Sequence, residues 1–355
     1  MTAGPDDPGV DAGTAGAPAP VDRRVAAGPD DPGVGGGAAL ELLRVMYRIR
    51  RFEEEVSRRK RADEVPGLIH LATGQEGVAA GVCAHLRADD AVYSGHRADG
   101  HALAMGAPPD RVLAELMGRA DGLCAGLGGS MHLVDVAHGF LGATGIVGGT
   151  VPLALGSALA HRMAGRDAVA AVFFGDGAVQ AGHFNESVNL ATLWRLPVLF
   201  VCENNGFAEF TPRSAHTGVE RVADVVAPYD LPSVTVDGDD AIAVWSAAGR
   251  LLGAARAGAG PALLECLTHR LRGHYEGDPE AYRRSASKDE RRRTDPIRRL
   301  RGSGTEAGWF TAADADDAER TAAEEIAAAV RFAQASPYPP ADRPASLVYA
   351  EGDAR

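Results

Sequence analysis

The chain has 355 residues, enough for one large α/β domain or two domains of ordinary size. Hydrophobic residues make up 45 % of it and charged residues 24 %, a balance typical of a soluble globular protein. The formal net charge is −12, and a chain this acidic repels phosphate backbones, so we expect no binding to nucleic acid. No run of about 18 apolar residues occurs, so we expect no membrane span.

The four cysteines lie far apart in the sequence and form no CxxC pair; they are Cys83, Cys124, Cys202 and Cys266. This spacing excludes a zinc ribbon and a framework of disulfides. It suits a reducing compartment, and we expect the protein to be cytoplasmic.

The first 36 residues form a tail rich in Gly, Pro, Ala and Asp, in which AGPDDPGV occurs at 3–10 and again at 27–34. With almost no large apolar side chain, this tail is predicted to be disordered. It resembles neither a secretory signal nor a transit peptide. We expect an α/β domain over 37–300, a helical extension over 301–343 and a second tail over 344–355.

The first predicted helix runs from about Ala38 to Lys60, because apolar residues recur there at helical spacing. The stretch 64–160 that follows is dense in glycine and histidine. That composition is costly in a scaffold, so it suggests backbone lying close to a ligand.

Two buried strands are predicted at 168–174 and 197–202, each a continuous apolar run. A helix over about 180–193 joins them into a βαβ unit, so the strands should be parallel. The alternation continues with a strand at 233–238, a helix at 241–257 and a strand at 261–270. We therefore predict a doubly wound, mostly parallel α/β fold.

Beyond this domain, a loop rich in Arg, Glu and Asp is expected over 276–295. Surface helices are predicted in DPIRRLR, at 295–301, and over 312–335. These helices form the C-terminal extension.

Polar residues follow both buried strands where they end. GDG at 175–177 comes after the first strand, and NN at 204–205 after the second. Both motifs should emerge at the carboxyl edge of the sheet, where open α/β sheets bind ligands. Asp176, Asn205 and the carbonyl of Phe207 could supply three oxygens to Mg²⁺, leaving positions for a diphosphate. We expect a helix starting after Gly177 to point its N-terminus at that anion.

Each motif alone fits a plain turn or a helix cap better than a ligand site. Their pairing at two consecutive strands reverses that preference. The pair at this spacing resembles the thiamine diphosphate fingerprint. The chain from about 38 to 342 is similar to the E1 α subunits of 2-oxo acid and acetoin dehydrogenase complexes, through HLATGQEG, GLGGSMH, GIVGGTVPL, VDGDD and the final DPI…SPYP.

The resemblance implies thiamine diphosphate and Mg²⁺ as cofactors and a role for individual residues. The implied metal ligands are Asp176, Asn205 and the carbonyl of Phe207. The implied diphosphate contacts are His96, Arg97, Gly177, Ala178, Arg270 and His274. The implied aminopyrimidine contacts are Gly145, Ile146 and Val147. The implied catalytic residues are His70, near the reacting carbon, and His274, in the active-site loop. His101 and His132 could also lie near the site.

The resemblance also implies partners. Thiamine catalysis needs a carboxylate at the aminopyrimidine ring, and the stretches around GIVGG and GLGGSMH offer none. In the family a β subunit supplies that glutamate. We therefore expect an α2β2 heterotetramer that passes an acyl group from a 2-oxo acid such as pyruvate, or from acetoin, to the lipoyl group of an E2 partner.

Several alternatives stay open or fail. A branched-chain 2-oxo acid dehydrogenase and a non-catalytic scaffold paralogue both remain. A nicotinamide enzyme fails because Gln180 stands where GxGxxG needs its third glycine. A serine hydrolase fails because His132 takes the last position of GxSxG around Ser130. Asp99 departs from the acetoin-type pattern, and near an anion it should point away or pair with Arg97.

Overall fold

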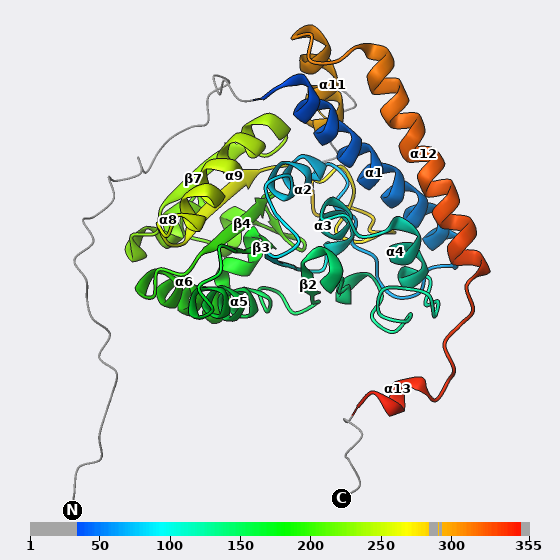
Figure 1. Cartoon of the computed structure of the whole chain (residues 1–355), viewed down its shortest axis with the longest axis horizontal. Helices are drawn as coiled ribbons and strands as arrows, with labels where there is room; N and C mark the ends of the chain where they lie inside the picture. The colour runs from blue at the N-terminus through cyan, green and yellow to red at the C-terminus, as the bar shows by residue number, and fades with distance from the viewer. Residues whose placement is uncertain (1–33, 284–289, 291–292, 349–355) are drawn as a thin grey trace, which may run out of the picture.

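A six-stranded parallel sheet forms the centre of the computed structural model, which describes residues 34–283, 290 and 293–348 (Figure 1). The spatial order is β2-β1-β3-β4-β8-β7, and all five pairings are parallel. The strands are β1 (Ala91–Ser94), β2 (Phe140–Ala143), β3 (Ala170–Gly175), β4 (Val198–Asn204), β7 (Ser233–Asp237) and β8 (Ala262–Leu267). The predicted doubly wound α/β fold is confirmed.

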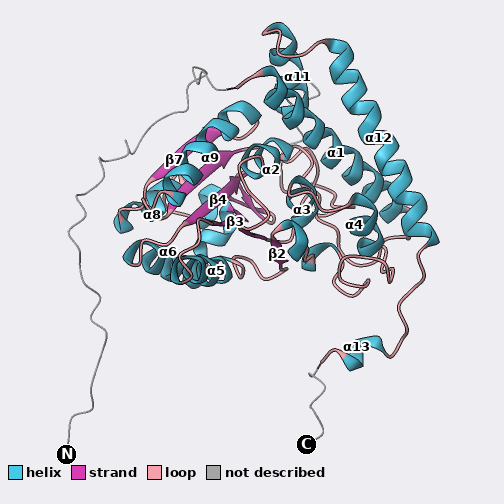
Figure 2. Ribbon diagram, viewed as in Figure 1, coloured by secondary structure: helices cyan, strands magenta, loops and turns pink. Residues whose placement is uncertain are grey.

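The central strands are buried because both faces of the sheet are covered by helices (Figure 2). Successive residues of β3 point to opposite faces, so Phe173 packs in one core cluster and Phe174 in the other. Burying a side chain of this size stabilises the fold by about 2–3 kcal/mol. The continuous apolar runs that predicted β3 and β4 are therefore the centre of the core.

Helices from both halves of the chain cover one face, and helices from its middle cover the other. The first layer contains α1 (Gly36–Arg61), α2 (Glu76–Cys83), α3 (Ala98–Ala104), α4 (Pro109–Leu116) and α9 (Ala241–Arg256). The second contains α5 (Val151–Met163), α6 (Gly182–Leu193) and α8 (Val222–Val226).

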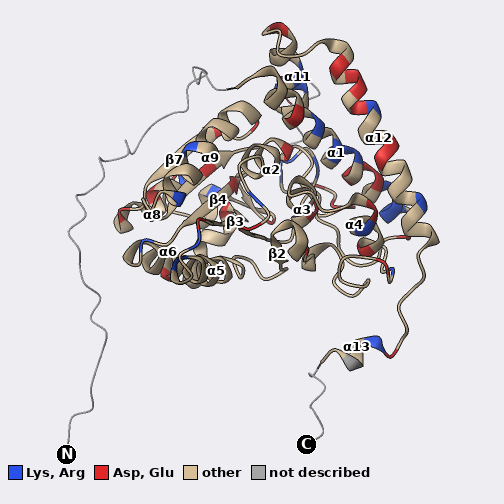
Figure 3. Cartoon of the chain, viewed as in Figure 1, with Lys and Arg blue, Asp and Glu red and all other residues tan. Residues whose placement is uncertain are grey.

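The C-terminal helices pack on the outside of the first layer. α12 (Ala312–Ala335) lies along α1 and α4, and α11 (Pro296–Glu306) lies at one end of α1 (Figure 1). Figure 3 shows that charged residues recur along α1 and α12. Between these two helices, Arg48 donates to Glu325 at 2.8 Å. The predicted boundary between 300 and 301 falls inside α11, and the division into domains stays a prediction.

Two details differ from the sequence-based expectation. A 3₁₀ turn, η3 (Asp176–Gln180), follows β3, and the α-helix begins only at Gly182. Within 64–160 the chain also forms β1 and β2, whose four residues each are too few to give a periodic signal. Most of the N-terminal tail (1–33), part of the 276–295 loop and residues 349–355 lie outside the described residues. No helix within the described ranges is long and apolar enough to cross a membrane.

Candidate functional site

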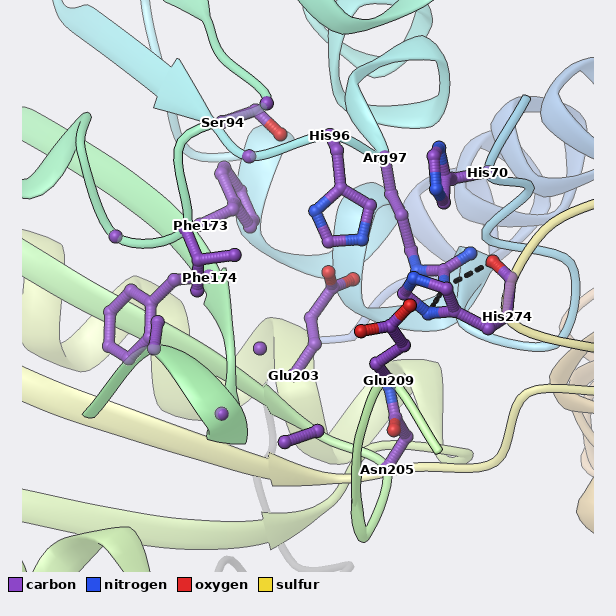
Figure 4. Close-up of a pocket in the computed structure, with 18 of the residues that line it drawn as sticks. His70, Ser94, His96, Arg97, Phe173, Phe174, Glu203, Asn205, Glu209 and His274 are labelled. Atoms are coloured by element: carbon purple, nitrogen blue, oxygen red, sulfur yellow. Dashed lines mark hydrogen bonds between the residues drawn. The ribbon is translucent and has the colours of Figure 1, made fainter. Parts of the chain in front are cut away.

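A cavity of about 420 Å³ opens at the carboxyl ends of β1, β3, β4 and β8 (Figure 4). Eleven of the predicted site residues line it: His70, His96, Arg97, Gly145, Val147, Gly177, Ala178, Asn205, Phe207, Arg270 and His274. Ile146 does not line it and is 69 % exposed. Asp176 lies behind the wall and is fully buried.

The end of β3 and the end of β4 bring Asp176 and Asn205 together, as their spacing predicted. Within the described residues, no hydrogen bond reaches either carboxylate oxygen of Asp176 or the side-chain oxygen of Asn205, although all three are buried. The Asn205 amide nitrogen donates to Gln75 Oε1 at 3.1 Å, which fixes the oxygen's orientation. A buried acceptor without a donor lowers the stability of the fold, and a bound cation would remove that cost for these three oxygens.

A cation here would need further oxygens. In the described part of the chain, no three His, Cys, Asp or Glu side chains are grouped to hold a metal. One carboxylate, one amide oxygen and a backbone carbonyl suit Mg²⁺, which keeps water and phosphate oxygens among its ligands. Gly177 packs so close to Ala208 that an added Cβ would lie 2.8 Å from the Ala208 Cβ. The residues present therefore fit a magnesium–diphosphate group.

A guanidinium and an imidazole stand beside Asp176. Arg213 Nη1 and His216 Nε2 each lie 3.8 Å from its Oδ2. Burial raises the pKa of Asp176, and the charge of Arg213 opposes that effect. No sequence signal marks either residue, because neither belongs to a motif.

Arginines and histidines from several segments meet in the same cavity as Asn205. Arg97 and Arg270 both donate to Nδ1 of His274, at 3.3 Å and 3.1 Å. Because a guanidinium cannot accept a hydrogen bond, this nitrogen carries no proton, and the ring is neutral. Arg97 also donates to the carbonyl oxygen of His274 at 2.8 Å, which fixes the loop after β8 against the start of α3.

The rings of His70, His96 and His274 lie 4.8–5.6 Å apart. Burial and the charge of Arg97 lower the pKa of His70 to about 4, of His96 to about 2 and of His274 to about 3. Burial also lowers the pKa of Arg97 to about 9. Two guanidinium groups and three neutral imidazoles therefore lie on one partly buried surface of the cavity. This combination suits a multiply charged anion.

The structure adds Glu203, which the motifs did not single out, and shows that the candidate His101 lines the cavity. Glu203, at the end of β4, lines the cavity, and its Oε1 lies 3.4 Å from Nε2 of His101. The Nδ1 of His101 lies 2.8 Å from Ser94 Oγ, and its ring stacks on Phe173. Glu203 directly precedes the Asn pair, so the strand-end argument that found Asn205 could have found it. His132 instead bonds the carbonyl of Gly128 and does not line the cavity.

Asp99 does not face the anion site. Its carboxylate accepts from Ser130 Oγ at 2.9 Å and 3.1 Å, and it makes no ion pair with Arg97 within the described chain. Burial raises the pKa of Asp99 to about 7. The sequence predicts that Asp99 either points away from a bound anion or pairs with Arg97. The structure shows the first of these arrangements.

Known proteins are similar in sequence to most of this chain. Residues 44–342 match the family model described as dehydrogenase E1 component. The chain is 44 % identical over 308 residues to the α subunit of acetoin:2,6-dichlorophenolindophenol oxidoreductase of Bacillus subtilis, covering 85 % of this chain and 90 % of the relative. It is 42 % identical to the Cupriavidus necator protein of the same name, with 84 % and 90 % covered. It is 40 % identical to the pyruvate dehydrogenase E1 component subunit alpha of Rhizobium meliloti, with 84 % and 86 % covered.

Proposed function

The chain belongs to the dehydrogenase E1 component family as an α-type subunit, and from that membership we propose that its cavity binds thiamine diphosphate through Mg²⁺ to act on acetoin or a 2-oxo acid such as pyruvate. Family membership implies thiamine diphosphate. The observation that carries the rest is one cavity lined by Asn205, Arg97 and Arg270, with Asp176 buried behind its wall. In the described chain no hydrogen bond reaches the carboxylate oxygens of Asp176 or the side-chain oxygen of Asn205.

Asp176, Asn205 and the Phe207 carbonyl would hold the metal, and Arg97, Arg270 and His96 would bind the diphosphate oxygens. When bound, thiamine diphosphate supplies the electron sink that stabilises the carbanion. His70 and His274 line the same cavity, where a neutral imidazole can accept or return a proton.

A β subunit is the partner that the relatives' subunit names imply. Large apolar side chains are exposed just before α5 and along it: Ile146, Val147, Leu153 and Met163 are 69 %, 53 %, 54 % and 80 % exposed. Val147 also lines the cavity, so a protein that covers this surface would close the site. We propose that the β subunit does so, in an α2β2 assembly that passes its acyl group to the lipoyl group of an E2 protein.

We propose a reducing cytoplasm as the cellular compartment. All four cysteines are free, and Cys83, Cys202 and Cys266 are buried. This supports the proposal of a reducing cytoplasm.

The test is reduction of a dye acceptor by the chain co-purified with its β subunit, with thiamine diphosphate and Mg²⁺ both present and each withheld. Acetoin, pyruvate and a branched-chain 2-oxo acid are compared side by side. Faster reduction with acetoin assigns the acetoin reaction, and faster reduction with a 2-oxo acid assigns a decarboxylating E1. A complex that binds no thiamine diphosphate would instead favour the scaffold paralogue.

A further inference from the structure

One buried carboxylate holds the segment between α4 and η1 (Ser130–His132), which has no helix or strand from Met117 to Gly129. Glu115, at the end of α4, is fully buried. Its Oε2 accepts the backbone N–H groups of Cys124 and Gly126 at 2.7 Å and 2.8 Å. Its Oε1 accepts those of Gly128 and Gly129 at 2.7 Å and 3.1 Å. Four donors in a segment of six residues leave this backbone little freedom.

The held segment leads directly into the cavity wall. Ser130 donates to Asp99, two residues beyond Arg97, and Met131 lines the cavity. Gly145 packs against the same methionine, since an added Cβ there would lie 3.5 Å from the Met131 sulfur. Gly145 also lines the cavity. The position of the backbone at 124–129 therefore decides where one wall of the site stands.

We propose that Glu115 is a positioning residue for the cofactor site, acting through the 124–129 backbone on the wall formed by Met131 and Gly145. The proposal rests on the proposed function, since the occupant of the cavity is thiamine diphosphate. A carboxylate is needed because both oxygens must accept. In Glu115→Gln the amide nitrogen would face two backbone N–H donors and lose both bonds.

The experiment uses the full chain with its β subunit and compares Glu115→Gln with Asp90→Asn. Asp90 is a matched control, a buried carboxylate that accepts the backbone N–H groups of Arg87 and Val169, both at 2.8 Å. It lies just before β1, at the amino edge of the sheet and away from the cavity. Both variants should lower the melting temperature, because each leaves buried N–H groups unpaired.

Only Glu115→Gln should weaken thiamine diphosphate binding, by roughly tenfold or more, as measured by calorimetry with Mg²⁺. Hydrogen exchange at Cys124, Gly126, Gly128 and Gly129 should be slow in the unchanged protein and fast in Glu115→Gln. Unchanged affinity in Glu115→Gln, or an equal loss in Asp90→Asn, overturns the proposal. If the unchanged complex binds no thiamine diphosphate, the proposed function falls, and this inference falls with it.

A second pair of variants covers the case in which Glu115→Gln does not fold. Gly126 has φ +77°, and an added Cβ would lie 2.6 Å from the carbonyl carbon of Gly118. Gly126→Ala should therefore displace the segment while Glu115 stays in place, and weaken thiamine diphosphate binding likewise. Gly165→Ala is its control, with φ +61° and no atom within 4 Å of an added Cβ. Equal affinity in the two variants would contradict the proposal.

Discussion

At the scale of single residues, buried carboxylates hold loops in place. In the described part of the chain, seven of them are at most 2 % exposed and accept hydrogen bonds from backbone N–H groups or side-chain donors: Glu53, Glu76, Asp90, Asp99, Glu115, Asp239 and Glu265. Charge-assisted bonds of this kind are about twice as strong as neutral ones, and leaving their donors unpaired costs the full desolvation of each group. The loops around the cavity are therefore ordered by acids that the ligand need not touch.

Glu265, on β8, gives the first prediction. Its oxygens accept from the Asn204 side chain at 2.7 Å, the Val222 backbone at 2.9 Å and the Thr235 hydroxyl at 3.1 Å. Glu265→Gln should lower the free energy of unfolding by about 2–4 kcal/mol, because an amide cannot accept at both ends. Urea denaturation measures this loss. Glu324→Gln, which removes an exposed partner of Arg320, should change the value by less than about 0.5 kcal/mol.

Glu53 gives a prediction about pH. Burial, opposed by hydrogen bonds from Thr73 and Ala72, raises the pKa of Glu53 from 4.5 to about 8. Between these values the folded chain holds a proton that the unfolded chain has lost, so this residue makes stability fall as pH rises. The slope is at most about 1.4 kcal/mol per pH unit. Glu53→Gln, which resembles the protonated form, should flatten it in urea titrations between pH 5 and 8. A steeper fall in the variant would contradict this.

The lowered pKa values of His70, His96 and His274 act in the opposite direction. Below the ordinary histidine value of 6.5 the unfolded chain binds protons that the folded chain refuses, so stability falls as pH drops from 6.5 toward 4. A bound diphosphate reverses the local charge and should raise these pKa values. Thiamine diphosphate binding should therefore take up protons, seen as buffer-dependent binding heats that shrink in His274→Gln. Equal proton uptake in His274→Gln and in the unchanged chain would exclude this role for His274.

Asp176 carries the metal prediction. Asp176→Asn keeps the shape of the side chain but removes its charge, and the described chain has no group of three His, Cys, Asp or Glu side chains that could hold the metal instead. Mg²⁺-dependent binding of thiamine diphosphate should then be lost in calorimetry, while Asp90→Asn retains it. Binding that stays unchanged in Asp176→Asn would remove Asp176 from the metal site.

At the scale of elements, the sequence predicted what burial dictates. β3, β4, β7 and β8, and the helices α1, α6, α9 and α12, all lie within a few residues of their expected ranges. Apolar runs and helical spacing are strong signals because each element must bury one surface. β1 and β2 have no such signal, because they have only four residues each and lie beside glycine-rich turns. They form strands through pairing with neighbouring strands of the sheet. The 3₁₀ turn after Asp176 is likewise a consequence of packing that no local pattern encodes.

The cap of α12 gives a prediction at this scale. Thr311 Oγ1 accepts from the backbone N–H of Asp314 at 3.1 Å, and the Asp314 carboxylate accepts from the Thr311 N–H at 2.8 Å. Thr311→Ala should lower the free energy of unfolding by about 1 kcal/mol, measured by urea denaturation. Thr305→Ala, which removes a hydroxyl that bonds the Arg301 carbonyl near the end of α11, is the control and should cost less. Equal losses would mean that the capping box adds nothing.

At the scale of the whole molecule, the site joins segments that only the fold brings together. Strand ends and family motifs located Asp176, Asn205, Arg97 and His274, because those residues follow recognisable patterns. Arg213 and Glu115 were not predicted, since their importance lies in contacts made across the fold with Asp176 and with a loop. The role of such residues depends on contacts in the folded chain, which no local sequence pattern encodes.

The exposed face of α5 carries the last prediction, that of assembly. Leu153 and Met163 of this helix are 54 % and 80 % exposed. The first Lys, Arg, Asp or Glu after Leu153 in the sequence is Arg162. Large apolar side chains grouped in this way mark a protein interface. Leu153→Asp combined with Met163→Asp should leave the melting temperature of the free chain within a few degrees, since both side chains are already in water, but abolish co-purification with the β subunit. Leu347→Asp, on a side chain 57 % exposed beside α13 (Arg343–Ser346), is the control and should leave assembly intact. A double variant that still assembles would place the β subunit elsewhere, and the cavity mouth at Val147 would then need another cover to exclude water.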